Sequence, residues 1–89
     1  MTGPGCGDGP DRRCAERCQC KERGKCGQKR GQCVATEEKH CRQSELCRLF
    51  GRCSLQGNEC VAASDADCKG SEQCVQVGKC IAKAGGCVR

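Results

Sequence analysis

The sequence predicts a small disulfide-rich fold of three tandem 27-residue units, each a short helical turn plus a β-hairpin with little hydrophobic core. Fourteen of the 89 residues are cysteine, well above the roughly 8–10% that is typical of a disulfide scaffold. Twelve of these cysteines form three sets with the same C-x5-C-x5-C-x6-C spacing, and each set lies 27 residues after the previous one. Such a fixed period indicates an array of repeated units.

The cysteine sets define three parts of the chain, which we call segment 1 (residues 11–35), segment 2 (36–62) and segment 3 (63–89). A flexible lead-in of Gly, Pro and Asp residues (1–10) precedes them and contains Cys6. In chain order, the three sets are Cys14, Cys20, Cys26 and Cys33; Cys41, Cys47, Cys53 and Cys60; and Cys68, Cys74, Cys80 and Cys87. The two remaining cysteines, Cys6 and Cys18, are predicted to pair and to attach the lead-in as a cap.

The apolar content is too low for an ordinary core. Leu, Ile, Val and Phe together number ten, and Trp and Tyr are absent. Buried apolar surface therefore cannot offset the conformational entropy of folding. A disulfide that closes a loop of about 13 residues contributes roughly 3 kcal/mol in the chain-entropy model. We expect seven disulfides to supply most of the stability.

The middle of each segment is predicted to form a short helical turn. In segments 2 and 3, Ser44 and Ser71 are suitable N-cap residues, and Gly51 and Gly78 can take the left-handed conformation that ends a helix. Segment 1 has Arg17 in place of the serine, so we expect a weaker turn there.

The last part of each segment is predicted to be a β-hairpin. Its turn residues are Gly31 in segment 1, Gly57 with Asn58 in segment 2, and Gly85 with Gly86 in segment 3. These strands are too short to form an independent sheet, so the disulfides must hold them.

Four cysteines in a segment allow three pairings. Pairing of sequence neighbours would leave the helical turn unattached to the hairpin, whereas the crossed pairing would staple the turn across both strands. The pattern C-x5-C-x3-G-x-C, followed by a hairpin to a fourth cysteine, resembles the N-terminal half of an epidermal-growth-factor-like module. It is similar to the cysteine-rich tandem repeats of secreted bacterial proteins. The resemblance implies bridges from the first cysteine to the third and from the second to the fourth: Cys14–Cys26 and Cys20–Cys33, Cys41–Cys53 and Cys47–Cys60, and Cys68–Cys80 and Cys74–Cys87.

The net charge of +5 is concentrated in segment 1, which has eight Lys or Arg residues and three acidic residues. Five of them lie between Cys20 and Cys33: Lys21, Arg23, Lys25, Lys29 and Arg30. We interpret this cluster as a candidate patch for an anionic partner, against the simpler alternative of a solvated basic loop.

Three functional alternatives follow from particular residues. The cysteines could form zinc sites, but the repeated spacings of five to seven intervening residues are not the C-x2-4-C knuckles of structural zinc, and His40 is expected at the surface. A serine-protease inhibitor could present the basic residue before the third cysteine, which is Lys25, Arg52 or Lys79. No catalytic constellation is recognisable, so we expect no enzyme activity and no cofactor.

The remaining classes are narrowed by composition. Nucleic-acid binding would lack stacking aromatic residues, so no sequence-specific nucleic acid is expected as a partner. No apolar run is long enough to span a membrane. Disulfides persist in oxidising compartments, which predicts a secreted, periplasmic or cell-surface protein, although no signal peptide is recognisable in this chain. The sequence therefore predicts a non-enzymatic structural or protein-interaction module with an unidentified protein or anionic surface as its partner.

Overall fold

The fold was obtained as a computed structural model, and the structure describes residues 6, 7, 9 and 11–89. Most of the lead-in predicted to be flexible, residues 1–5, 8 and 10, lies outside these described residues. The elements in chain order are η1 (Cys14–Glu16), α1 (Cys18–Arg23), β1 (Gly27–Lys29), β2 (Gln32–Val34), α2 (Glu38–Arg42), α3 (Glu45–Phe50), β3 (Ser54–Gln56), β4 (Glu59–Val61), α4 (Asp65–Lys69), α5 (Glu72–Val77), β5 (Ile81–Lys83) and β6 (Gly86–Val88).

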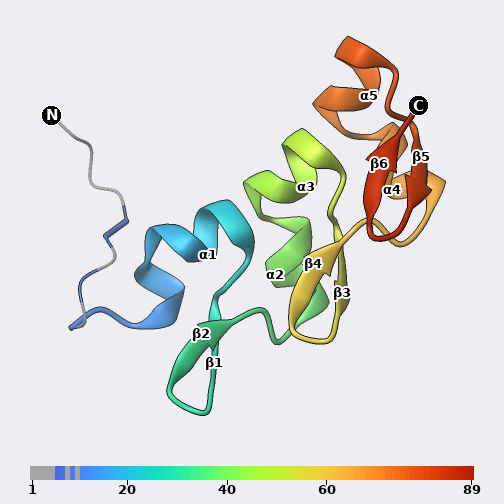
Figure 1. Ribbon diagram of the computed structural model, residues 1–89. Helices are drawn as coiled ribbons and strands as arrows, with labels where there is room; N and C mark the ends of the chain where they lie inside the picture. The colour runs from blue at the N-terminus through green and yellow to red at the C-terminus, as the bar shows by residue number, and fades with distance from the viewer. Residues whose placement is uncertain (1–5, 8, 10) are drawn as a thin grey trace, which may run out of the picture.

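Short helices and small antiparallel hairpins alternate along the chain. In each segment, two short helical elements are followed by one two-stranded hairpin. Figure 1 shows the three hairpins side by side along one edge of the molecule, while α1, α3 and α5 follow the opposite edge. The result is a thin plate that measures 41 × 33 × 15 Å.

The predicted helical turns are confirmed. The hydroxyl groups of Ser44 and Ser71 accept hydrogen bonds from the backbone N–H groups of Cys47 and Cys74, each at 3.2 Å, and so cap α3 and α5. Both helices end at a left-handed glycine, Gly51 and Gly78. The residue before α1, Arg17, makes no side-chain cap, but α1 also ends at a left-handed glycine, Gly24.

The first helical element of each segment was not predicted. Elements η1, α2 and α4 are only three to five residues long, which is too short to produce a recognisable apolar period. Their acidic first-turn residues, such as Glu38 and Asp65, are the one local signal. This omission matters because these elements carry the first cysteine of each set.

The predicted hairpins are confirmed, with one correction. Each connects its strands through two residues with positive φ, as in a type I′ turn: Arg30–Gly31, Gly57–Asn58 and Ala84–Gly85. The expected turn at Gly85–Gly86 is therefore wrong by one residue. Gly86 already belongs to β6, where it pairs with Lys83.

The crossed disulfide pairing implied by the resemblance is wrong. The first cysteine of each set is bonded to the fourth, at a separation of 19 residues, and we call these the long-span disulfides: Cys14–Cys33, Cys41–Cys60 and Cys68–Cys87. The second is bonded to the third, at a separation of six, and we call these the short-span disulfides: Cys20–Cys26, Cys47–Cys53 and Cys74–Cys80. Cys6 is bonded to Cys18, as expected, so the seven disulfides use all 14 cysteines.

The helix cap explains the nested pairing. Because Gly51 reverses the chain, the backbone N–H of Arg52 donates to the carbonyl of Leu46 at 3.1 Å. This reversal brings Cys53 back beside Cys47, with 4.3 Å between their Cα atoms. The long-span disulfide then attaches α2 to β4, and α2 is further held to this hairpin by a hydrogen bond from the Leu55 N–H to the Glu38 carboxylate.

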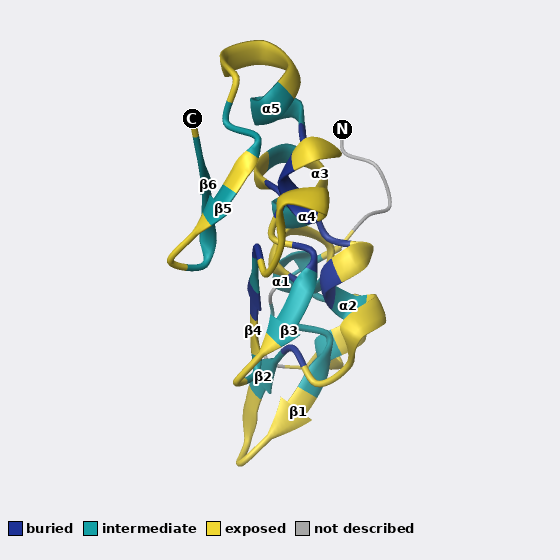
Figure 2. Ribbon diagram, turned by 90° about the vertical axis from the view of Figure 1, so that its right-hand side faces the viewer, coloured by how far each residue is buried: buried dark blue, intermediate teal, exposed yellow. Residues whose placement is uncertain are grey.

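The core consists mainly of disulfides, as the composition predicts. Its fully buried members are cysteines and alanines, not large aliphatic side chains: Ala35, Cys41, Cys53, Cys60, Ala62 and Cys68. Leu46 and Leu55 pack against the centre of this cluster. Figure 2 shows the buried residues along the middle of the plate, with the tip of the β1–β2 hairpin fully exposed.

Candidate functional site: grooves at the segment junctions

Each helix-capping glycine in segments 1 and 2 packs against the long-span disulfide of the following segment. A Cβ atom built on Gly24 would lie 2.7 Å from the Cys60 sulfur and 2.9 Å from the His40 carbonyl oxygen. A Cβ atom on Gly51 would lie 2.6 Å from the Cys87 sulfur. The glycine is therefore required twice, for its positive φ and for this close approach.

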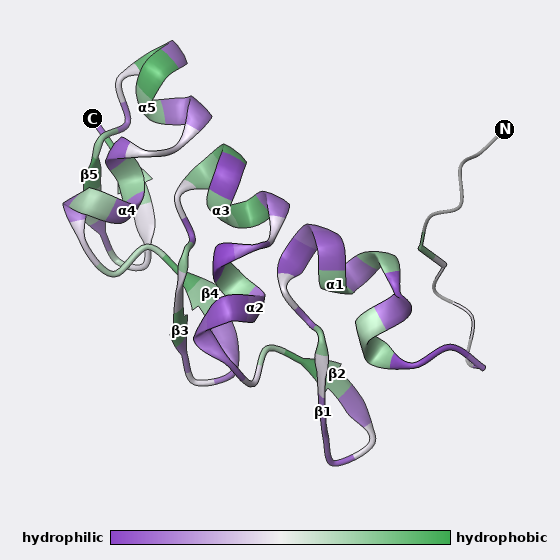
Figure 3. Cartoon of the chain, turned by 180° about the vertical axis from the view of Figure 1, so that it is seen from behind, coloured by the Kyte–Doolittle hydropathy of each residue, from purple (hydrophilic) through white to green (hydrophobic). Residues whose placement is uncertain are grey.

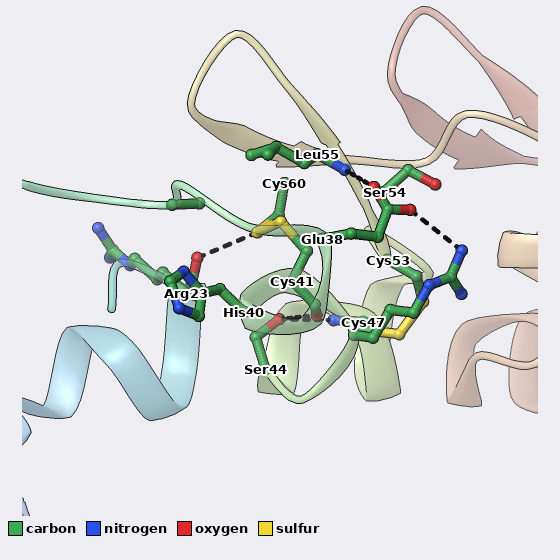
Figure 4. The surroundings of a disulfide bond; sticks show 12 residues. Arg23, Glu38, His40, Cys41, Ser44, Cys47, Cys53, Ser54, Leu55 and Cys60 are labelled. Atoms are coloured by element: carbon green, nitrogen blue, oxygen red, sulfur yellow. Dashed lines mark hydrogen bonds and ion pairs between the residues drawn. A yellow bond between two sulfur atoms is a disulfide. The ribbon is translucent and has the colours of Figure 1, made fainter. Parts of the chain in front are cut away.

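A carbonyl oxygen beside each of these glycines also contacts the same sulfur. The Arg23 carbonyl lies 3.4 Å from the Cys60 sulfur, as Figure 4 shows, and the Phe50 carbonyl lies 3.1 Å from the Cys87 sulfur. A disulfide sulfur has no hydrogen to donate, so these are S···O contacts and not hydrogen bonds. The two junctions thus share one geometry.

The hairpin turns complete the junctions on the other edge of the plate. The Asn58 side-chain amide donates to the carbonyl of Ala35 at 2.9 Å and accepts from the Lys29 ammonium at 2.9 Å. At the second junction, the backbone N–H of Ala62 donates to the carbonyl of Gly85 at 2.9 Å. Each segment is therefore joined to the next at both its helical edge and its hairpin edge.

A hollow lies between these two attachments at each junction. The hollow between segments 1 and 2, which we call groove A, has a volume of about 220 Å³ and is lined by Arg23, Lys25, Leu46, Arg52, Asn58, Glu59 and Cys60. The hollow between segments 2 and 3, which we call groove B, has a volume of about 400 Å³ and is lined by Leu46, Phe50, Arg52, Gln73, Lys79, Gly86 and Cys87.

The grooves are basic and partly apolar. Lys25, Arg52 and Lys79 all occupy the position between the capping glycine and the third cysteine, and Arg52 lines both grooves. Among the lining residues, Glu59 in groove A is the one acidic side chain, and groove B has none. Leu46 contributes apolar surface to both grooves, so the two grooves together can accept negative charge beside an apolar group.

The structure divides the basic patch that was predicted in segment 1. Arg23 and Lys25 line groove A, but Lys21, Lys29 and Arg30 do not. Lys21 lies in the last turn of α1, whereas Lys29 and Arg30 lie at the β1–β2 turn, and Figure 1 shows these elements at opposite edges of segment 1. The single continuous patch is therefore wrong, because clustering in sequence was taken for clustering in space.

The basic residues of segments 2 and 3 that line the grooves, Arg52 and Lys79, were noticed in the sequence only as candidate inhibitor residues. Their aligned position in every segment was visible. What could not be seen was the stacking of one segment on the next, which turns that position into a groove wall.

A metal centre finds no arrangement to support it. Within residues 6, 7, 9 and 11–89, no group of three or more His, Cys, Asp or Glu side chains could hold a metal ion. His40 is not the surface residue that the sequence predicts, since its side chain is only 12% exposed. Its Nδ1 atom accepts a hydrogen bond from the backbone N–H of Thr36 at 3.3 Å. The ring therefore serves to hold the start of segment 2.

Comparisons with known proteins give no family to which the chain can be assigned. No protein-family model, curated protein or solved structure matches it. No helix in the described part of the chain has the length and apolar character needed to span a membrane. The extensive disulfides fit a stabilised extracellular module.

Proposed function

We propose that this protein is a non-enzymatic binding module of three repeated units, secreted or held at a periplasmic or cell surface, and that it binds an acidic, extended segment of a protein partner. The observation that carries the proposal is the row of aligned basic residues, Lys25, Arg52 and Lys79, on the walls of successive grooves. Disulfides fix the walls, so little side-chain or backbone ordering is needed when the partner binds.

The composition of the grooves favours a peptide over a polysaccharide polyanion. Phe50 is 38% exposed and lines groove B with Leu46, next to the Arg52 guanidinium. A densely sulfated chain would gain nothing from this apolar surface, whereas a peptide that alternates acidic and apolar side chains would use both. The partner class is therefore an acidic peptide segment with at least one apolar side chain.

The protease-inhibitor alternative has weaker support. An inhibitor of that kind would present its basic residue on a protruding loop, but Lys25 and Arg52 line hollows between segments. The zinc alternative is disfavoured because all 14 cysteine sulfurs are in disulfides and cannot act as thiolate ligands.

The experiment compares two charge reversals in the oxidised protein. Arg52→Glu changes both grooves, and Arg30→Glu makes the same charge change at a hairpin tip outside them. The probe is a fluorescent peptide of alternating Glu and Leu, with a Gln–Leu peptide and heparin as comparisons. We expect Arg52→Glu to weaken binding of the acidic peptide at least about tenfold, equivalent to about 1.4 kcal/mol, and Arg30→Glu to leave it nearly unchanged.

Two results would overturn the proposal. Equal weakening by both variants would mean that net charge alone attracts the peptide. Binding of heparin in preference to the acidic peptide would assign the grooves to a polysaccharide. Native mass spectrometry without reductant verifies that each variant retains seven disulfides.

A further inference from the structure

The outer end of segment 3 displays the same capping glycine as the two junctions, but with nothing packed on it. Gly78 has φ of 75°, as Gly24 does, and it ends α5 in the same way. Gly24 and Gly51 are buried, whereas Gly78 is exposed, and no described atom lies within 4 Å of a Cβ built on it. We call the surface formed by Val75, Val77, Gly78 and Arg89 the tail face.

The outer end of segment 1 displays the other half of the junction. Its long-span disulfide, Cys14–Cys33, aligns with the disulfides that receive Gly24 and Gly51. Cys14 is half-buried, although the aligned Cys41 and Cys68 are completely buried. The turn residue Gly31 also has open space around it. We call the surface formed by Cys14, Cys18, Gly31, Gln32 and Cys33 the head face.

The two faces differ from the internal junctions in a complementary way. Between segments 2 and 3, Arg48 of α3 forms an ion pair with Glu72 of α5. On the tail face the position of Arg48 is taken by Val75, which is 82% exposed. On the head face the position of Glu72 is taken by Cys18, which is bonded to Cys6. The charged pair of the internal junction is thus replaced by two apolar groups.

The hydropathy of the helices agrees with this replacement. Figure 3 shows a hydrophobic outer turn on α5, whereas α1 at the other end of the row is mainly hydrophilic. Val75 and Val77 supply this turn, and both are exposed. An exposed apolar surface at the end of an otherwise polar plate marks an interaction site.

We propose that the tail face binds the head face of a second copy of this chain, with the geometry of the internal junctions. The contact is heterologous, so each copy keeps one free tail and one free head, and association continues into linear chains. Every such contact would place Lys79 of one copy opposite Gln32 of the next, in the position of a further groove. The association concerns the ends of the plate and requires no acidic ligand.

Arg89 opposes this contact. Its Nε donates a hydrogen bond at 2.8 Å to the carbonyl of Val77, the group that aligns with the sulfur-contacting carbonyls of Arg23 and Phe50. The residues aligned with Arg89 are Ala35 and Ala62, which are both buried at a junction. The arginine side chain must move before a second copy can dock, so the association of the unmodified chain is weakened.

Sedimentation equilibrium of the oxidised full chain, from micromolar to millimolar concentration, tests the proposal. We expect concentration-dependent association of the unmodified chain, and about tenfold tighter association of Arg89→Ala. Val75→Arg blocks the tail and Gln32→Arg blocks the head, where it opposes Lys79. Each of these two variants alone should remain monomeric, and a mixture of them should form a dimer and nothing larger.

The controls separate the alternatives. Gln43→Arg adds the same charge at an exposed site away from both faces and should leave association unchanged. If only Val75→Arg abolishes association and the mixture stays monomeric, the tail faces bind each other and the proposal is wrong. A monomeric Arg89→Ala variant at millimolar concentration, with no dilution-dependent change in the amide signals of Gly31 and Gly78, would also overturn it. Peptide binding by the monomer is measured independently, so failure here leaves the groove function intact.

Discussion

The long-span and short-span disulfides use the same bond in two different environments. In segment 2, both sulfur-bearing residues of the long-span disulfide, Cys41 and Cys60, are buried, and the Cys60 sulfur lies under the cap of α1. The short-span partner Cys47 is only half-buried, and its disulfide closes a turn that the backbone has already reversed. One kind of disulfide joins segments, and the other secures a single helix end.

This difference shows how a chain with few large apolar residues builds junctions. A long-span disulfide holds the first helix of its own segment against its hairpin, and its sulfur then provides the packing surface for the preceding glycine. Cross-link and core are therefore the same atoms. The mechanical consequence is that damage to one long-span disulfide reaches the neighbouring segment.

Removal of the two kinds of disulfide gives the largest expected contrast. The double substitution Cys41→Ala with Cys60→Ala should lower the free energy of unfolding by about 3 kcal/mol from loop entropy alone, with a further loss from the cavity. The double substitution Cys47→Ala with Cys53→Ala should cost about 2 kcal/mol. Urea unfolding followed by far-UV circular dichroism measures both losses.

Hydrogen exchange distinguishes the mechanisms. Faster exchange at the Gly24 amide is expected only without the Cys41–Cys60 disulfide, since the Cys60 sulfur packs on that glycine. The opposite pattern, with Gly24 disturbed by loss of the Cys47–Cys53 disulfide, would contradict the assignment of the junction to the long-span disulfide.

Two glycine substitutions isolate the packing part of the junction. Gly51→Ala and Gly78→Ala both place a side chain at φ near 75°, which costs about 1 kcal/mol in each. Only the Cβ of Gly51→Ala meets neighbouring atoms: the Cys87 sulfur at 2.6 Å and the Cys68 Cα at 2.9 Å. We expect a total loss of about 2–4 kcal/mol for Gly51→Ala, because overpacking adds to the backbone strain. Equal urea midpoints for the two variants would show that the close approach carries no energy.

Local features of this fold were predictable because single residues specify them. The serine caps, the left-handed glycines and the turns at Gly31 and Asn58 need no information from outside their own segment. The turn at Ala84–Gly85 was placed one residue late because two adjacent glycines looked favourable. Alignment with Gly57–Asn58, 27 residues earlier, would have corrected it.

Pairing and site were not predictable because both depend on contacts between distant elements. The cysteine spacing is compatible with several pairings, and the choice depends on α2, a helix too short for the sequence to indicate. The basic position of Lys25, Arg52 and Lys79 was visible as a column. Its role as a groove wall requires the glycine-on-disulfide stacking, for which a single segment contains no pattern.

The smallest effect is expected at the exposed ion pair between Arg48 and Glu72, which also crosses the second junction. These side chains are 57% and 44% exposed, so water screens their attraction, and Arg48→Ala should cost less than about 1 kcal/mol. The matched control is Arg42→Ala, which breaks the Arg42–Glu38 pair within α2 and crosses no junction. We expect similar small losses for both variants, reduced further at high salt. A loss for Arg48→Ala as large as that for Gly51→Ala would mean that the helix edge, and not the buried glycine and sulfur, holds segments 2 and 3 together.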